Sequence, residues 1–311
     1  MKKAFRIHWL GGFGLSLAGL LTLAAVTRAA EDFTVDTAHA AATKGDARAE
    51  YFLARYYAEG KGVLPDYAQA AQYAQDAANQ GYAPAQTCLG SFYAHGLGVE
   101  QNLSDALQWY RKAATQHDAL AEYCLGYAYA YGQGAPKDMN AALQWWWQSA
   151  NQGQVYAENA LGQHYFLGEG GGDTNINYAE SARWLLKAAE QNYAGAMNNL
   201  GYLYQHGLGV SEDWQQALKW YRRAAEHGDA MAQANLGLMY ESGDGVQLDK
   251  VEAYKWFSLS AEKENVEGKH SYEQYNVYHY LTPEQFAEAR RKVDEFHAQT
   301  RTNQLGTVSG L

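Results

Sequence analysis

The chain contains little proline. Four prolines occur among 311 residues, whereas 47% of the residues are hydrophobic. Proline interrupts helices, and a chain that is poor in apolar residues cannot bury a core. This composition therefore predicts a folded chain and excludes an intrinsically disordered one.

Basic residues are outnumbered by acidic ones. The chain has 24 Lys and Arg against 34 Asp and Glu, which gives a net charge of −10. Nucleic-acid binding needs a basic surface, so this class of partner is excluded. Beyond the first 29 residues, no apolar run is long enough to span a bilayer, and no membrane contact is expected there.

Catalytic and metal-binding motifs are also missing. The sequence holds no Gly-Lys-Ser/Thr phosphate loop, no Gly-x-Ser-x-Gly elbow and no His-Glu-x-x-His. Residues 260–263 match Ser-x-x-Lys, but no Lys-Thr-Gly follows. Residues 173–177 begin like a calcium loop, yet Tyr178 and Trp184 stand where that loop needs Gly and Glu. We therefore expect no enzyme activity, cofactor or metal.

The first 29 residues have the pattern of an export signal. Lys2, Lys3 and Arg6 precede the apolar run Trp9–Val26, and residues 27–29 read Thr-Arg-Ala. A basic start, an apolar segment and small residues at the cleavage site are typical of a secretory signal peptide. We predict cleavage after Ala29 and a bacterial periplasmic or secreted product. An uncleaved inner-membrane anchor is the alternative.

Cleavage would make the mature chain more acidic. The segment 1–29 contains four of the 24 basic residues and no acidic residue, so 20 basic residues remain against 34 acidic ones, a net charge of −14. This change strengthens the case against a nucleic-acid partner.

The rest of the sequence is dominated by an internal repeat, of which Leu89–Val99 is the clearest copy. The spacing between copies is 36 residues, except for one of 39 that places an insertion within Gly168–Asn177. A leucine recurs at Leu53, Leu89, Leu125, Leu161, Leu200 and Leu236, and a tyrosine four residues later at Tyr57, Tyr93, Tyr129, Tyr165, Tyr204 and Tyr240. A fixed period between about 20 and 50 residues predicts a solenoid.

Each repeat is predicted to be a pair of helices, which we name helix A and helix B. In residues 81–116, Ala85, Leu89 and Tyr93 lie four apart on one face of helix A, and Gly96 ends it. The repeated tyrosine, as at Tyr57 and Tyr93, is predicted to be core. Helix B then needs an N-cap, and the candidates are Asp66, Asn102, Asp138, Asn177, Asp213 and Asp249. Helix B carries an aromatic residue predicted to be core, at Tyr73, Trp109, Trp145, Trp184, Trp220 and Trp256.

The repeat pattern is A-x-x-x-L-G-x-x-Y-x-x-G-x-G-V, followed by Asp, Ala, Trp-Tyr and Ala-Ala. It resembles the Sel-1-like repeat family, relatives of the tetratricopeptide repeat, over about residues 45–264. The resemblance implies an all-α fold, an α/α right-handed superhelical solenoid of about six helix-turn-helix repeats that binds other proteins. Some secreted members have been described as binding or slowly hydrolysing β-lactams, which leaves an enzymatic alternative.

The predicted boundaries follow the repeat. A signal peptide (1–29) precedes an N-terminal capping helix (30–44). Six repeats follow at 45–80, 81–116, 117–152, 153–191, 192–227 and 228–264. Capping helices at 265–297 end near His297, because Leu281–Gln285 reads as a helix start with Thr as N-cap and Pro at the first position. Residues 298–311 are expected to form a flexible tail.

The two cysteines, Cys88 and Cys124, occupy the same position of neighbouring repeats. An oxidising compartment favours a disulfide between them. However, equivalent points of packed helices lie about 8–10 Å apart, while the Cα atoms of a disulfide lie within about 7 Å. Free thiols are therefore favoured, with a disulfide as the alternative.

A row of helix A positions is predicted to bind the partner. If helix A lines a concave groove, as in the tetratricopeptide relatives, the row lies two and one residues before the Leu and two and six after it. Its candidate binding residues are Tyr51, Arg55, Tyr123, Tyr127, Tyr131, Asn159, Gln163, Asn198, Asn199, Tyr202, His206 and Asn235. Its other members are Phe52, Thr87, Cys88, Ser91, His95 and Cys124.

The residue types of this row suit recognition. Tyrosine offers a large rigid surface, and the amide of asparagine can hold peptide backbone through both its donor and its acceptor. Asn199 and Asn235 resemble the asparagines that grip peptides in tetratricopeptide grooves. The alternative is that the tyrosines 123, 127 and 131 only cover the groove wall.

The sequence thus predicts an exported, monomeric interaction scaffold that binds a protein or peptide in its concave groove. A β-lactam-binding protein or cell-wall hydrolase is the alternative from another class. A periplasmic immunity protein against an exported toxin is an alternative among binding functions.

Overall fold

The computed structural model describes residues 33–60, 64–168, 176–263, 269–270, 273 and 280–308. The predicted signal peptide and residues 169–175 of the insertion lie outside the described residues. All regular structure in the described part is helical. None of the helices in these ranges combines the length and the apolar character needed to cross a membrane.

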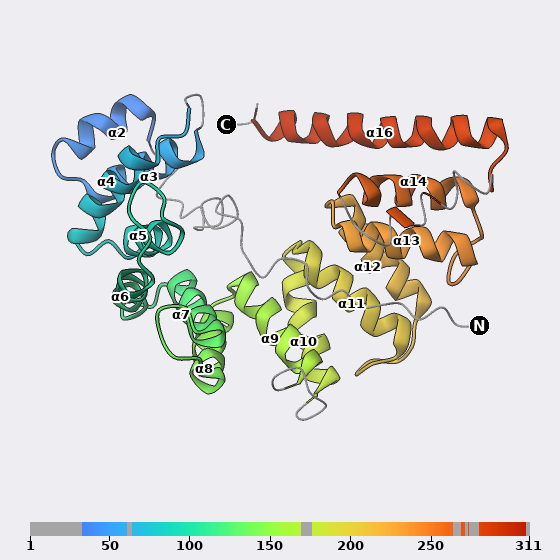
Figure 1. Ribbon diagram of the computed structural model, residues 1–311, viewed down its shortest axis with the longest axis horizontal. Coiled ribbons are helices and arrows are strands. Elements are labelled where there is room, and N and C mark those ends of the chain that lie inside the picture. The colour runs from blue at the N-terminus through green and yellow to red at the C-terminus, as the bar shows by residue number, and fades with distance from the viewer. Residues whose placement is uncertain are drawn as a thin grey trace. The chain divides into compact units, whose positions relative to one another are not determined.

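The helices follow the predicted alternation of A and B (Figure 1). Helix A of the six repeats is α3 (Ala47–Glu59), α5 (Ala83–His95), α7 (Ala119–Tyr131), α9 (Val155–Leu167), α11 (Ala194–His206) and α13 (Ala230–Ser242). Helix B is α4 (Tyr67–Asn79), α6 (Leu103–Ala114), α8 (Met139–Asn151), α10 (Tyr178–Glu190), α12 (Trp214–Glu226) and α14 (Lys250–Glu262). The chain forms two compact units, residues 1–157 and 158–311.

The helix ends are set by the residues that the sequence indicates. All six predicted N-cap residues of helix B accept a backbone N–H of the first turn. The glycine that ends helix A has a φ between +62° and +79° in every repeat, at Gly60, Gly96, Gly132, Gly168, Gly207 and Gly243. Only glycine adopts this left-handed conformation without strain, so the turn recurs with the repeat.

Helix A and helix B approach each other at the glycine that follows the repeated leucine. A Cβ atom added to Gly126 would lie 2.3 Å from Cδ1 of Trp146, and one added to Gly237 would lie 2.6 Å from Cε1 of Phe257. The same contact pairs Gly90 with Tyr110, Gly162 with Leu185 and Gly201 with Tyr221. The glycine therefore makes room for a large side chain of helix B.

The first repeat has a different pair of residues at this contact between helix A and helix B. Ala54 stands where the later repeats have glycine, and Ala74 stands where they have the large residue. Both alanines are fully buried in one apolar cluster. Both residues of the pair are therefore small in the first repeat, and no large side chain of helix B fills this contact.

Two predictions about the core need correction. The repeated tyrosines are only half-buried, and in two of them the hydroxyl meets an arginine at the surface: Arg111 donates to Tyr129 at 2.8 Å and Arg222 to Tyr240 at 2.7 Å. In the aromatic series of helix B, Tyr73, Trp109 and Trp145 are half-buried as well, while Trp184, Trp220 and Trp256 are buried. The residue that fills the core in each later repeat is the next one, at Tyr110, Trp146, Leu185, Tyr221 and Phe257.

A polar pair joins the start of helix A to the end of helix B within four repeats. Gln80 donates to Glu50 at 2.6 Å, and Gln152 donates to Glu122 at 2.7 Å. Gln191 and Glu158 form the same bond, and Gln116 with Gln86 is a neutral version at 2.9 Å. The acidic members are buried, and burial raises the pKa of each carboxyl.

Single helices lie at both ends of the described repeats. Helix α2 (Val35–Ala42), at the place of the predicted N-terminal cap, begins at the N-cap Thr34 and packs on α3. Helix α16 (Pro283–Val308) packs on α14, and its first turn carries the expected cap between Thr282 and Gln285. The structure differs beyond His297, where the helix continues to Val308 instead of giving way to an irregular tail.

The close contact at Gly126 leads to a stability prediction. In the Gly126→Ala variant, the new methyl group overlaps the Trp146 ring, so we expect a loss of about 1–3 kcal/mol in the free energy of unfolding. Gly195→Ala is the control, because Gly195 lies in a helix and the nearest atom to its added Cβ, Cε1 of Tyr193, is 3.3 Å away. Urea denaturation measures both, and equal stability of the two variants would contradict this account.

The buried carboxyl of Glu122 leads to a prediction about pH. Its pKa in the folded state is raised by burial, so the folded protein binds more protons than the unfolded chain as the pH rises above the ordinary value of 4.5. The contribution of Glu122 to stability is therefore greatest below that value and falls as the pH rises through its folded pKa.

Glu122→Gln should flatten this pH dependence, since Gln86 and Gln116 already show that a neutral pair fits the site. The measurement is urea denaturation between about pH 4 and 8. Glu100→Gln removes an exposed carboxyl as the control. An unchanged pH profile in Glu122→Gln would contradict the assignment.

Candidate partner-binding surface

The structure distributes the predicted row of helix A between buried and accessible positions. Among the candidate binding residues, the buried ones are Tyr51, Tyr123, Asn159 and Asn235. Half-buried ones are Arg55, Tyr127, Gln163, Asn198, Asn199 and Tyr202, and exposed ones are Tyr131 and His206. Tyr51, Tyr123 and Asn235 contact neighbouring repeats, so the surface open to a partner is narrower than the sequence indicates.

Three tyrosines of α7 and one of α9 form a continuous chain of rings, which we call the tyrosine cluster: Tyr123, Tyr127, Tyr131 and Tyr156. The ring centroids of Tyr127 and Tyr131 lie 4.6 Å apart, and those of Tyr123 and Tyr156 lie 5.5 Å apart. Tyr123 anchors the cluster in the protein, while Tyr131 is 44% exposed. The cluster therefore presents aromatic surface on a rigid base.

Partial burial raises the pKa of the accessible tyrosines in this cluster further above neutral pH. It raises the pKa of Tyr127, and burial together with the neighbouring Tyr127 raises the pKa of Tyr131 to about 12. Both hydroxyls are therefore neutral near pH 7 and can donate or accept a hydrogen bond. The cluster suits a partner that offers apolar surface together with backbone polar groups.

The asparagines of the row bond to one another in the second unit. Asn235 donates to the Oδ1 atom of Asn198 at 3.0 Å, and Asn198 lies 3.4 Å from the Oδ1 atom of Asn199. Their amides are thus partly occupied by one another. Beside them on α11, Tyr202 packs on His206 with ring centroids 4.2 Å apart, and on Phe166 of α9 at 5.8 Å.

The start of the row, in the first repeat, is largely internal. Tyr51 packs on the Tyr82 ring of the next repeat at 5.5 Å, and Arg55 pairs with Glu59 at 2.7 Å. Cys88 and Cys124 are buried free thiols, and burial raises the pKa of each to about 12. Such thiols are neutral and unreactive near pH 7.

Two aromatic members of these patches, Tyr156 and Phe166, were missed by the sequence analysis. Both lie on α9, five residues before and after the repeated Leu161. The equivalent residues of the third repeat are Leu120 and Ala130, which are both buried. Comparing the residues five positions before and after each repeated leucine could have identified these two as contacts to the preceding and following repeats.

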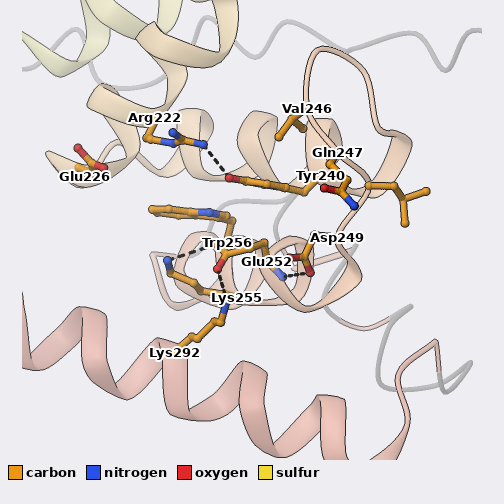
Figure 2. Close-up of a pocket in the computed structure, with 11 residues that line it drawn as sticks. Arg222, Glu226, Tyr240, Val246, Gln247, Asp249, Glu252, Lys255, Trp256 and Lys292 are labelled. Carbon is orange, nitrogen blue, oxygen red and sulfur yellow. Dashed lines mark hydrogen bonds and ion pairs between the residues drawn. The ribbon is translucent and has the colours of Figure 1, made fainter. Parts of the chain in front are cut away.

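A pocket of about 500 Å³, which the sequence analysis also missed, lies in the second unit beside α16 (Figure 2). Figure 2 shows the Arg222 guanidinium bonded to Tyr240 on one side, and Lys255 and Lys292 around Glu252 on the other. The remaining lining residues are Glu226, Val246, Gln247, Leu248, Asp249 and Trp256. No short motif could reveal this site, because its residues come from α12, α13, α14, α16 and a loop.

Metal ligands do not gather at either surface. Within the ranges that the structure describes, no three His, Cys, Asp or Glu side chains stand close enough together to hold an ion.

Stacked helical hairpins with a repeated core and a variable helix A face define a helical-repeat scaffold for protein interactions. The Sel1 repeat family matches this chain at residues 47–82, 83–118, 119–154, 155–193, 194–229 and 230–265. The chain therefore belongs to the Sel1 repeat family. Each matched repeat begins two residues after the boundary predicted from the sequence.

Two solved structures are similar to the chain. One is a protective antigen of uropathogenic Escherichia coli with an SLR fold, at 29% identity and a TM-score of 0.66; the match covers 89% of this chain and 62% of that one. The other is a Sel1 repeat protein from Oxalobacter formigenes, with the same identity and TM-score, over 74% of this chain and 100% of that one. A search of curated protein sequences gave no match.

Proposed function

We propose that the protein is an exported interaction scaffold that binds a protein or peptide through the accessible part of the helix A row. The observation that carries this proposal is the tyrosine cluster, in which Tyr131 is 44% exposed and its ring packs on that of Tyr127, while Tyr123 at the other end of the cluster is buried. Tyrosine is enriched among the residues that dominate binding energy, since it buries a large area at little entropic cost.

The variation of this row between repeats supports the proposal. The leucine and tyrosine of helix A recur in every repeat, whereas the accessible positions of the row change from Tyr127 and Tyr131 in the third repeat to Tyr202 and His206 in the fifth. Packing requires only that the stacking residues repeat. A surface that recognises one particular partner is expected to vary between repeats in this way.

The tyrosine cluster is tested with a double variant, Tyr127→Ala with Tyr131→Ala. We expect the same partner bands that the wild-type chain captures from a periplasmic extract to fall about tenfold or more, as for the loss of a binding hot spot. Thermal unfolding checks that the fold remains.

Tyr280→Ala serves as the control, because Tyr280 is 42% exposed and lies outside the row. Equal losses in both variants would show that the cluster is not the binding surface. Capture of a single exported toxin would identify the partner as that of an immunity protein.

Export is tested through the mature N-terminus. Cleavage after Ala29 predicts that intact mass spectrometry of the periplasmic product finds a chain beginning at Ala30. Ala29→Phe places a bulky residue where the signal peptidase requires a small one, so the variant should keep its N-terminal segment. A wild-type product of full length would contradict cleavage and favour an anchored protein.

A further inference from the structure

The accessible part of the tyrosine cluster is uncharged, although the whole chain carries a net charge of −10. Burial alone raises the pKa of Tyr127, and burial with the neighbouring Tyr127 raises the pKa of Tyr131, so no charged side chain acts on either hydroxyl. By contrast, the pKa of Tyr51 is raised by burial and also responds to the charges of Arg55 and Asp118. A charged group of a partner would lose its hydration at the cluster without gaining a counter-ion, so the surface favours an uncharged segment.

The polar groups of this surface are hydroxyls. The Tyr127 hydroxyl is accessible and bonds to no other residue in the described part of the chain, because its side chain makes only ring contacts, with Tyr123 and Tyr131. The backbone of α7 beside it is engaged in the hydrogen bonds of the helix. A partner therefore meets a hydroxyl that can donate to a carbonyl oxygen, next to an exposed aromatic ring.

Three common modes of peptide binding need features that this surface lacks. Strand addition requires a sheet edge, and all regular structure in the described ranges is helical. Acidic or phosphorylated segments are bound by clusters of arginine, and no cation acts on the two accessible tyrosines. An amphipathic helix needs a long apolar groove, whereas Tyr123 and Tyr156 of the cluster are buried and only Tyr131 is exposed.

A segment in the polyproline II conformation meets the remaining conditions. Its carbonyl groups make no internal hydrogen bond, and its prolines carry no N–H that would need an acceptor on the surface. Proline rings can pack on aromatic rings, and the segment loses little conformational entropy because its conformation exists before binding. Neither the segment nor the cluster needs a charge for this contact.

We propose that the tyrosine cluster binds a proline-rich segment of its partner protein in the polyproline II conformation. A proline ring packs on the ring of Tyr131, and a carbonyl oxygen of the segment accepts a hydrogen bond from the Tyr127 hydroxyl. Tyr123 supports these rings from within the protein, with its ring centroid 6.5 Å from that of Tyr127 and 5.5 Å from that of Tyr156. This inference rests on the proposed function, since it names the kind of partner segment for the same surface.

The test uses the full mature chain and a fluorescein-labelled peptide amide, Ala-Pro-Pro-Ala-Pro-Pro-Ala-Pro-Pro, followed by fluorescence anisotropy. We expect it to bind at least about tenfold more tightly than the same peptide with Ser in place of every Pro, because only the proline form is ordered before binding. Higher salt should change this affinity little, since no ion pair forms. Equal affinity of the two peptides, or no binding of the proline peptide, overturns the proposal.

Matched variants separate the hydroxyl from the ring. Tyr127→Phe should weaken the proline peptide about three- to tenfold, as for the loss of one hydrogen bond, whereas Tyr129→Phe removes a hydroxyl from another face of α7 and should leave the affinity unchanged. Tyr131→Ala should weaken binding about tenfold or more, and Tyr280→Ala, at another exposed tyrosine, should not. Equal effects within either pair contradict the assignment.

Two further outcomes separate this inference from its alternatives. Displacement of the proline peptide by a neutral oligosaccharide, cellohexaose, at concentrations similar to those of unlabelled peptide would assign the cluster to glycans and overturn the proposal. Loss of partner capture in Tyr127→Ala with Tyr131→Ala, without binding of the proline peptide, would overturn this inference alone. Full capture by that double variant would overturn the proposed function, so the two failures are distinguishable.

Discussion

The contact between a glycine of helix A and a large side chain of helix B sets the geometry of every later repeat. At Gly126, the space for a Cβ atom is already filled by the Trp146 ring. Helices that meet at a glycine can approach closely, and the buried aromatic surface supplies much of the hydrophobic stabilisation. The first repeat differs, because Ala54 and Ala74 stand at this contact and both are fully buried.

This contact uses one face of helix A and leaves another face to the neighbouring repeats and to solvent. What a residue of the second face does depends on the repeat next to it. Tyr123 is covered by Tyr156, whereas Tyr131, two turns further along the same helix, remains exposed. A single periodic row can therefore supply packing at one end and a recognition surface at the other.

Local signals explain which features could be predicted from the sequence. Helix caps such as Asp138 and glycine turns such as Gly132 act within a few residues, and the leucine period identifies the face that packs. The repeat period shows which face of a helix packs, but not how deeply each residue is buried. The repeated tyrosines are therefore predicted to be core, although they are only half-buried.

The remaining features depend on residues far apart in the sequence. Asn235 bonds to Asn198 of the preceding repeat, and α16 brings Lys292 beside Glu252 in the pocket at Arg222. Charged pairs of this kind carry no periodic signal. The sequence showed that the helix at 283 starts after Thr282, but not which side chains of the last repeat it would meet.

The end of a repeat array is where a new site can arise most easily. An inner repeat is restrained on both sides, so its exposed residues must remain compatible with two neighbours. The last repeat meets α16 instead, and this freedom is visible at Glu252 and Lys255, where the third repeat has Ala141 and Gln144. The tyrosine cluster and the pocket share no residue and lie in different compact units.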